Sequence, residues 1–391
     1  MKTGSVGDND GSEHEVYVRV AGDDDSIFLD LCDGDRNVVE ITAQGWSVVS
    51  RAAGQDKGGG SRVVEVRFRR PPVMMALPVP VPGGKWDIIK PFINVAADDD
   101  YSLILSWCVA SVRPDRPAPI LYLLGEHGSA KSTAAKVIRA LLDPCKAPLR
   151  TLPRDERDLY VLASNGRIIC FDNVSKLYPW MSDALCRLAT GGGLATRKLY
   201  TDDDEAVFDC LRPIIMNGIA QAATRADFLD RSLLIDTVVI DESKRRTEAE
   251  FWCDFDAARA QMLGVILNGV SSALRRVSEV KLPYKPRMAD FAVFSVAAES
   301  GLGFQQNTFE KAYDSNRATA ADEAIAATAI GPNVLELMQD QTAAFKGTFA
   351  ELLARLDALE GKEKVAGLAG NSAQAERGYE AAGSNSPEKG H

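Results

Sequence analysis

The stretch ILYLLGEHGSAKST, residues 120–133, decides the fold. Its apolar first five residues predict a short buried strand, and the spacing of apolar residues from Ala134 to Leu142 predicts a helix directly after the turn. A glycine-containing turn between a strand and a helix gathers backbone N–H groups at the helix N-terminus, where they can bind phosphate oxygens. Further apolar runs at 167–171, 213–216 and 233–240 alternate with helical patterns. The sequence therefore predicts a phosphate-binding loop in an α/β fold with a parallel sheet.

The residue types of this loop suit a nucleotide site. Lys131 can reach terminal phosphates, and the hydroxyl of Ser132 can bind Mg²⁺. Ala130 stands where the usual motif has glycine, so we expect it to adopt a negative φ. The alternative, an ordinary turn before a helix, is disfavoured by the flanking strand and helix. The predicted nucleotide-binding residues are Gly125, Glu126, His127, Gly128, Ser129, Ala130, Lys131, Ser132 and Thr133.

A second apolar run ends in the carboxylate that a magnesium–nucleotide site needs on an adjacent strand. This residue is Asp172, which with Ser132 is the predicted metal-binding pair. A carboxylate that caps the next turn is the alternative. Many ATPases have a second acid at the following position, but Asn173 cannot accept a proton. Asn173 then only positions water, or a carboxylate of the preceding segment approaches: Asp155, Glu156 or Asp158.

A glycine turn at 190–193 leads into a basic and aromatic segment. Arg197 and Lys198 suit phosphate contacts, and Tyr200 suits stacking on a base. The acidic residues at 202–205 favour a solvated hairpin instead. Charge alone leaves these two interpretations equal.

Two polar residues follow further apolar runs. Asn217 can sense a γ-phosphate by hydrogen bonding, and an ordinary turn residue is the alternative. Arg231 is a candidate arginine finger for a neighbouring subunit, with Arg225 in reserve. The alternative for Arg231 is a salt bridge to Asp227 or Asp230.

The rest of the chain predicts strands before this core and helices after it. Alternating apolar residues with glycine turns dominate up to about residue 70, and helical spacing dominates from 246. Thr348 and Glu351 form a capping box for the last helix. The predicted parts are a disordered tail (1–13), a β-rich domain (14–70), a proline- and glycine-rich linker (71–84), the core (85–245), a helical domain (246–360) and a second disordered tail (361–391).

Composition excludes several classes of protein. The 45 basic and 55 acidic side chains give a net charge of −10, which argues against bulk coating with nucleic acid. No apolar run is long enough for a membrane span, and no apolar leader follows Met1. Seven scattered cysteines without a close pair indicate reduced thiols, and three histidines make a histidine metal centre or a Ser-His-Asp triad unexpected. We therefore expect a cytoplasmic protein without membrane contact.

In this order the motifs resemble the ATPase module of superfamily III helicases, within the AAA+ group. The likeness is to primase–helicase proteins of phages, poxviruses and integrated mobile elements, and it covers about residues 85–300. It implies an AAA+-like P-loop NTPase fold: a parallel sheet flanked by helices, with a small N-terminal β-rich domain and a C-terminal helical region. The matching segments are 125–133, 171–173, 190–200, 213–217 and 230–231.

The resemblance also implies an activity. Such a protein hydrolyses ATP with Mg²⁺, assembles as a homo-oligomeric ring and moves or unwinds single-stranded DNA in phage or mobile-element replication. Asn217 would be sensor one, and Arg231 would act across the subunit interface. Lys131, Asp172, Asn173, Asn217 and Arg231 are then the catalytic candidates, and Arg197, Lys198 and Tyr200 would grip DNA in the channel.

Departures from the family pattern leave competing hypotheses. No primase carboxylate cluster precedes the core, so primer synthesis is not expected. Residues 346–359 resemble the first helix of a winged-helix unit that is truncated. Because Asn173 is a poor base, the second hypothesis is an ATP-dependent oligomeric switch with little hydrolysis that regulates partner or DNA binding. The third is a plain α/β binding domain of another class.

Overall fold

The chain divides into two compact units, Met1–Ala321 and Asp322–His391. In the second unit, residues 349–356 form a helix that begins with the predicted capping box, in which Glu351 N donates to Thr348 Oγ1 (3.3 Å). The computed structural model describes residues 5–7, 13–50, 66–192, 194–197, 205–208, 210–218, 225–326, 328, 331, 333–334, 337 and 345–356.

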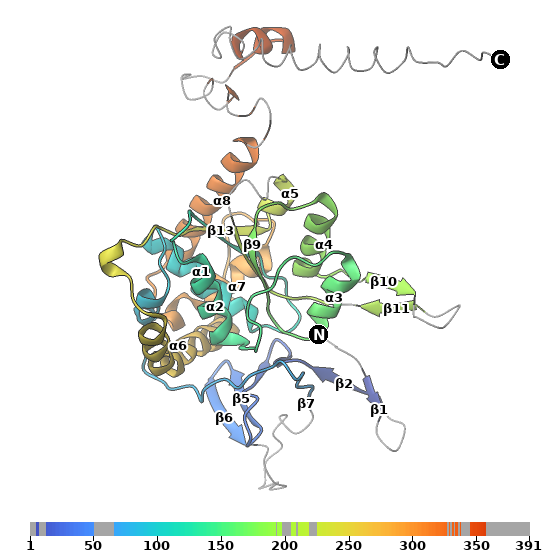
Figure 1. The fold of residues 1–391 in the computed structure, drawn as a ribbon, viewed down its shortest axis with the longest axis vertical. Helices are drawn as coiled ribbons and strands as arrows, with labels where there is room; N and C mark the ends of the chain where they lie inside the picture. Colours follow the sequence, from blue (N-terminus) through green and yellow to red (C-terminus); the bar gives the residue numbers. More distant parts are fainter. Residues whose placement is uncertain are drawn as a thin grey trace, which may run out of the picture. The chain divides into compact units, whose positions relative to one another are not determined.

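A four-stranded parallel sheet lies at the centre of the first unit (Figure 1). Its order is β13-β8-β12-β9, and in its register Leu121 pairs with both Ile215 and Leu233. The parallel sheet is confirmed, although the last strand ends four residues earlier than the apolar run predicts, because Thr237 pairs instead with Val95. The strands are β8 (Ile120–Leu124), β9 (Ile169–Val174), β12 (Ile214–Gly218) and β13 (Ser232–Asp236).

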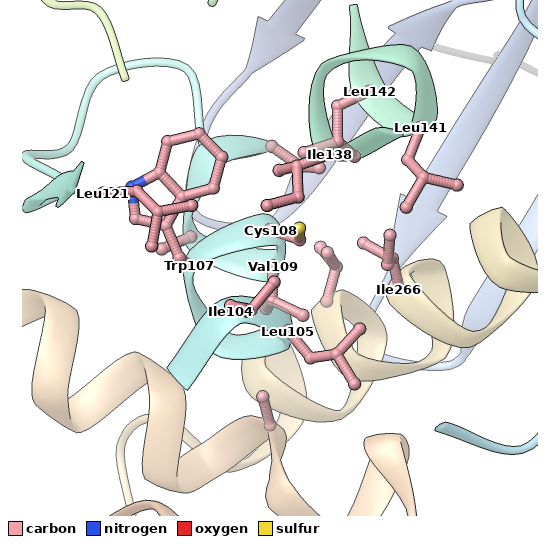
Figure 2. Packing of buried hydrophobic residues seen from close by; sticks show 14 of the residues in the cluster. Ile104, Leu105, Trp107, Cys108, Val109, Leu121, Ile138, Leu141, Leu142 and Ile266 are labelled. Carbon is pink, nitrogen blue, oxygen red and sulfur yellow. The ribbon is translucent and has the colours of Figure 1, made fainter. Parts of the chain in front are cut away.

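Helices cover both faces of this sheet. Leu121 and Leu123 belong to the main core, whereas Tyr122 points to the opposite face and meets the Phe228 ring at 6.4 Å between centroids. Figure 2 shows side chains of α1, α2, α6 and β8 packed together around Cys108, which is fully buried. This core places the start of α2 beside the end of β8. The flanking helices are α1 (Asp98–Ser111), α2 (Lys131–Leu142), α3 (Glu156–Ser164), α4 (Pro179–Thr190) and α5 (Ala226–Leu229).

A group of long helices follows the sheet. The helical spacing that the sequence shows from 246 is confirmed by α6, which begins with a capping box formed by Thr247 and Glu250. Among the described residues, no helix combines the length and apolar character that a membrane crossing needs. The group consists of α6 (Glu248–Arg276), α7 (Ala289–Leu302) and α8 (Thr308–Ala326), and the 3₁₀ helices η2 (Trp86–Phe92) and η4 (Glu242–Lys244) lie earlier in the chain.

The residues before the core form two small sheets. One has the order β1-β2-β7, and the other is antiparallel with the order β3-β4-β5-β6. Strand β1 lies within residues 1–13, for which the sequence predicts an irregular tail; its pairing with β2 stabilises it. The strands are β1 (Ser5–Gly7), β2 (Glu13–Tyr17), β3 (Val20–Gly22), β4 (Ser26–Asp30), β5 (Asn37–Thr42), β6 (Gly45–Ser50) and β7 (Arg67–Phe68).

Arg19 joins these strands to the core. Its side chain is fully buried, and its Nε donates to Asp143 Oδ1 at 3.1 Å. The guanidinium also donates to the carbonyls of Asp30 (2.9 Å) and Met75 (2.6 Å). Asp143 in turn accepts from the backbone amide of Arg167 at 2.9 Å. A buried ion pair of this kind is tolerated because hydrogen bonds satisfy the remaining donors and acceptors.

The segment 71–84, which the sequence predicts to be a linker, packs against both the N-terminal strands and helix α6. Leu77 is buried, and its amide donates to the Leu31 carbonyl at 2.9 Å. Val81 donates to the Ala260 carbonyl at 3.0 Å. These contacts anchor the segment along its length, so it does not span free solvent.

Breaking the buried pair from one side should strongly destabilise the protein. We expect Arg19→Met to lower the free energy of unfolding by about 3 kcal/mol or more, because it leaves a buried carboxylate without its partner. Urea denaturation followed by circular dichroism measures this. Arg116→Ala is the control, since the Arg116–Asp24 pair is exposed and should cost less than about 1 kcal/mol. Equal losses in the two variants would contradict the assignment.

Candidate functional site

The loop between β8 and α2 lies at the carboxyl edge of the sheet. Gly125 has φ +144°, and a Cβ atom there would lie 2.4 Å from Thr237 Oγ1. Thr237 closes the loop from the next strand, because its hydroxyl lies 2.7 Å from both the Leu124 carbonyl and Ser129 Oγ. Sequence reasoning missed Thr237, since only the sheet order brings it to the loop. The loop is thus held in one shape by its neighbour strand.

Ala130 has the opposite φ sign to the one expected from the sequence. Its φ is +63° and its ψ 28°, the left-handed conformation, which for alanine costs about 1 kcal/mol. The expectation of a negative φ is therefore wrong. Ala130 is the N-cap residue of α2, and its carbonyl accepts from Ala134 N at 2.9 Å. Alanine occupies a conformation in which the usual glycine is free of strain.

The ammonium group of Lys131 lies over the loop. Its Nζ donates to the carbonyls of Gly125 and Glu126, both at 2.6 Å, and lies 3.4 Å from Ser129 Oγ. Partial burial lowers the pKa of Lys131, while the negative charge of Asp172 acts in the opposite direction. The side chain is therefore a positive charge held beside the backbone amides that begin α2.

Asp172 joins three elements of the fold. Its Oδ1 accepts from Ser132 Oγ and from Asn217 Nδ2, each at 2.6 Å. Asn217 Oδ1 accepts from the amide of Asn173 at 2.7 Å. The sequence predicts Asp172 on a strand adjacent to the loop strand, but β12 lies between β8 and β9. This correction explains the cluster, because the intervening strand is the one that ends with Asn217.

The predicted metal pair fits a magnesium–nucleotide site. Ser132 and Asp172 supply a hydroxyl and a carboxylate oxygen at contact distance, and oxygen ligands are those that Mg²⁺ prefers. No group of three or more His, Cys, Asp or Glu side chains that could hold a metal ion occurs in the described part of the chain. One hydroxyl and one carboxylate suit an ion that keeps several waters and is otherwise held by substrate phosphates.

The residues considered for positioning or activating the attacking water differ in their surroundings. Asn173 is exposed and has φ +54°, a left-handed conformation that asparagine tolerates. Asp155 caps α3 by accepting from Asp158 N at 2.8 Å, and Glu156 pairs with Arg187. The carboxylates of Asp155 and Glu156 are therefore engaged at the N-terminus of α3, and Asp158 lies in the first turn of that helix.

Arg231 lies at the opposite edge of the sheet. Its carbonyl accepts from Ile120 N at 2.8 Å, where β8 begins, whereas Lys131 follows the end of β8. Five strand residues at about 3.3 Å each separate the two edges by roughly 15 Å. The guanidinium pairs with Asp227, the alternative considered from the sequence, and Arg225 pairs with Asp183 at 2.9 Å. Arg231 is thus not brought to the Lys131 cluster of its own chain.

Of the predicted DNA-contacting residues, Arg197 lies in one of two paired strands. Strands β10 (Leu194–Arg197) and β11 (Glu205–Phe208) are antiparallel, and Arg197 is in register with Glu205. Lys198 and Tyr200 lie outside the described residues. The roles proposed for these three side chains stay predictions.

Comparisons with known proteins identify a family. Residues 86–322 match the model described as "Actinomycete integrative conjugative element replication protein". Among the curated proteins, no sequence matches. Lys131, Asp172, Asn217 and Arg231 all lie inside the matched segment.

Three solved structures of the apo C-terminal region of NrS-1 are similar to this chain. Their identities are 12%, 11% and 11%, and their TM-scores are 0.38, 0.37 and 0.39. The alignments cover 68%, 71% and 84% of this chain, and 69%, 72% and 83% of the respective structures.

The left-handed residue of the loop gives a direct test. We expect Ala130→Gly to raise the free energy of unfolding by about 1 kcal/mol, because it removes the strain of a positive φ. Thermal or urea unfolding measures the change. Ala134→Gly, one turn into α2, is the matched control and should lower stability by about 1 kcal/mol, since glycine weakens a helix interior. If both glycine variants lose stability equally, Ala130 is not strained.

Proposed function

Because the chain belongs to the family of actinomycete integrative conjugative element replication proteins, we propose that it is a P-loop ATPase of the superfamily III helicase type, coupling ATP hydrolysis to DNA translocation or unwinding. Replication of a mobile element is the role that the family match gives. The observation that carries the proposal is the cluster of Lys131, Ser132, Asp172 and Asn217 at the carboxyl edge of one parallel sheet. Ligands of open α/β sheets bind at this edge.

The triphosphate would bind between the loop and α2. The first amides of this 12-residue helix and the loop amides around Ser129 are donors for phosphate oxygens. Lys131 would exchange the carbonyls of Gly125 and Glu126 for the β- and γ-phosphates, to which an ammonium group binds more strongly than to neutral carbonyls. Ser132 and Asp172 would hold Mg²⁺, which supplies positive charge against the phosphates.

Hydrolysis would proceed by in-line attack of water on the γ-phosphate. Asn217 links Asp172 to the Asn173 backbone, so its amide is placed to respond to a phosphate beside Asp172. Asn173 is exposed there and would orient the water without taking its proton. Arg231, about 15 Å from the Lys131 edge, would complete the site of a neighbouring copy. The proposed active form is therefore a homo-oligomer, for which a ring is the simplest closed arrangement.

Single-stranded DNA is the proposed partner of the β10–β11 hairpin. The net charge of −10 means that binding needs local contacts. Arg197 and Lys198 are proposed to bind phosphates, and Tyr200 is proposed to stack on a base.

A second candidate function is an ATP-dependent switch with little hydrolysis. The amide of Asn173 at the position of the second acid favours it, because an amide cannot accept the proton of the attacking water. Asp155 and Glu156 are engaged elsewhere and do not replace that base. The switch would bind ATP and change its assembly or its contacts with DNA.

Removal of the loop lysine tests the proposed site. We expect Lys131→Ala to lower ATP hydrolysis by about 100-fold or more, because it removes the charge that stabilises the transferring phosphoryl group. A phosphate-release assay with Mg²⁺ measures the rate. Lys136→Ala, on the same helix, is the matched control and should keep the wild-type rate. A wild-type rate of hydrolysis in Lys131→Ala would contradict the assignment of this loop as the nucleotide site.

Turnover with DNA separates the motor from the switch. A motor should hydrolyse ATP several-fold faster with single-stranded DNA, whereas a switch should change its particle mass with ATP and keep a low rate. Phosphate release and mass photometry, each with and without single-stranded DNA, read both properties. Loss of the DNA effect in Arg197→Ala would support the hairpin contact, and an unchanged effect would contradict it.

A further inference from the structure

Asp227 lies between two arginines at the edge of the sheet opposite the nucleotide loop. Its Oδ1 is paired with Arg231, which also donates to the Asp227 carbonyl at 2.9 Å. The same Oδ1 lies 3.4 Å from Nη2 of Arg287. Arg287 comes from the segment between α6 and α7, whereas Asp227 lies in the short helix α5 and Arg231 directly precedes β13. The Asp227 carboxylate is thus paired with Arg231, at the start of a sheet strand, and with Arg287, from the helical part of the same unit.

The three side chains differ in exposure. About half of Asp227 (49%) and of Arg287 (47%) is exposed, but only 14% of Arg231. Exposed ion pairs contribute little to stability, so Asp227 can change its partner at small cost. A phosphate group binds a guanidinium through two charge-assisted hydrogen bonds, which makes it a strong competitor for Arg231.

We propose that Asp227 and Arg287 are positioning residues for Arg231. In the isolated subunit, the ion pair with Asp227 holds the guanidinium of Arg231 beside α5. When a neighbouring copy presents its bound triphosphate, Arg231 turns to the phosphate and Arg287 keeps the Asp227 carboxylate paired. This inference rests on the proposed ATPase function and adds a control on its arginine finger.

The surroundings favour Arg287 over Arg225 as the arginine that keeps Asp227 paired when Arg231 leaves. Arg225 is engaged by Asp183 at 2.9 Å and by the Pro179 carbonyl at 3.1 Å. The ion pairs of Arg287 with Asp227 and Asp230 are long, at 3.4 and 3.8 Å, so a small movement would bring Arg287 into full contact with Asp227. Removing Arg287 would leave Asp227 dependent on Arg231 alone.

The two residues should therefore act in opposite directions. At subunit concentrations where the oligomer is partly formed, we expect Asp227→Asn to raise ATP hydrolysis and Arg287→Ala to lower it, each by about two- to fivefold, the size expected for one exposed ion pair. Arg287→Lys should restore most of the rate, and Arg287→Ala should have no effect in an Asp227→Asn background. Asp254→Asn, which breaks the exposed Arg246–Asp254 pair, is the matched control and should not change the rate.

Assembly gives a second readout that does not need turnover. With a non-hydrolysable ATP analogue and Mg²⁺, mass photometry should show the oligomer forming at lower concentration for Asp227→Asn and at higher concentration for Arg287→Ala. The inference is overturned if Asp227→Asn and Arg287→Ala change the rate and the assembly in the same direction, or if neither variant changes them. The proposed function would still stand in that case, provided that hydrolysis depends on Lys131. A wild-type protein that neither binds nor hydrolyses ATP overturns both.

Discussion

The Asp172 carboxylate is the contact on which the candidate site depends. One of its oxygens accepts hydrogen bonds from Ser132 at the start of α2 and from Asn217 at the end of β12. Three segments far apart in the sequence meet there because β8, β12 and β9 are parallel and end at the same edge. A change of sheet order or strand direction would separate the residues that the proposed chemistry brings together.

Helix α2 is tied to β9 at both of its ends. At its N-terminus Ser132 contacts Asp172, and beyond its C-terminus Asp143 accepts from the amides of Arg167 (2.9 Å) and Ile168 (3.0 Å), where β9 begins. The other carboxylate oxygen of Asp143 accepts from Arg19, which belongs to the N-terminal strand region. The same helix therefore connects the candidate site at one edge of the sheet with the buried ion pair at the other. This is a physical route by which the N-terminal strands support the geometry of the loop.

The two edges of the sheet have different chemistry. The carboxyl edge carries the loop, Asp172 and Asn217, whose contacts are short hydrogen bonds between partly buried groups. The opposite edge carries Arg231 and Asp227 in an ion pair in which Asp227 is half-exposed. Because a rigid sheet separates the edges, a single copy cannot bring Arg231 to its own Lys131. If ATP is the ligand, the division of these residues between two edges makes assembly part of the chemistry.

The sequence by itself determined the local features of this protein. The run of Ile120 to Leu124 predicts a strand, the apolar spacing from Ala134 predicts a helix, and Thr348 with Glu351 predicts a capping box that the helix at 349–356 uses. These features depend on neighbours a few residues apart, so the pattern is enough to predict them. The β-rich leader was predictable for the same reason, and the parallel direction of the central strands followed from the alternation of strands and helices along the chain.

Only the tertiary structure decided the rest. The left-handed conformation of Ala130, the closure of the loop by Thr237 and the position of β12 beside both β8 and β9 follow from packing between distant segments. The partner of Arg231 was one of two alternatives until the geometry of α5 selected Asp227. A linear pattern records which residues are present, but pairing in a parallel sheet is set by the burial of whole strands, which no local pattern encodes.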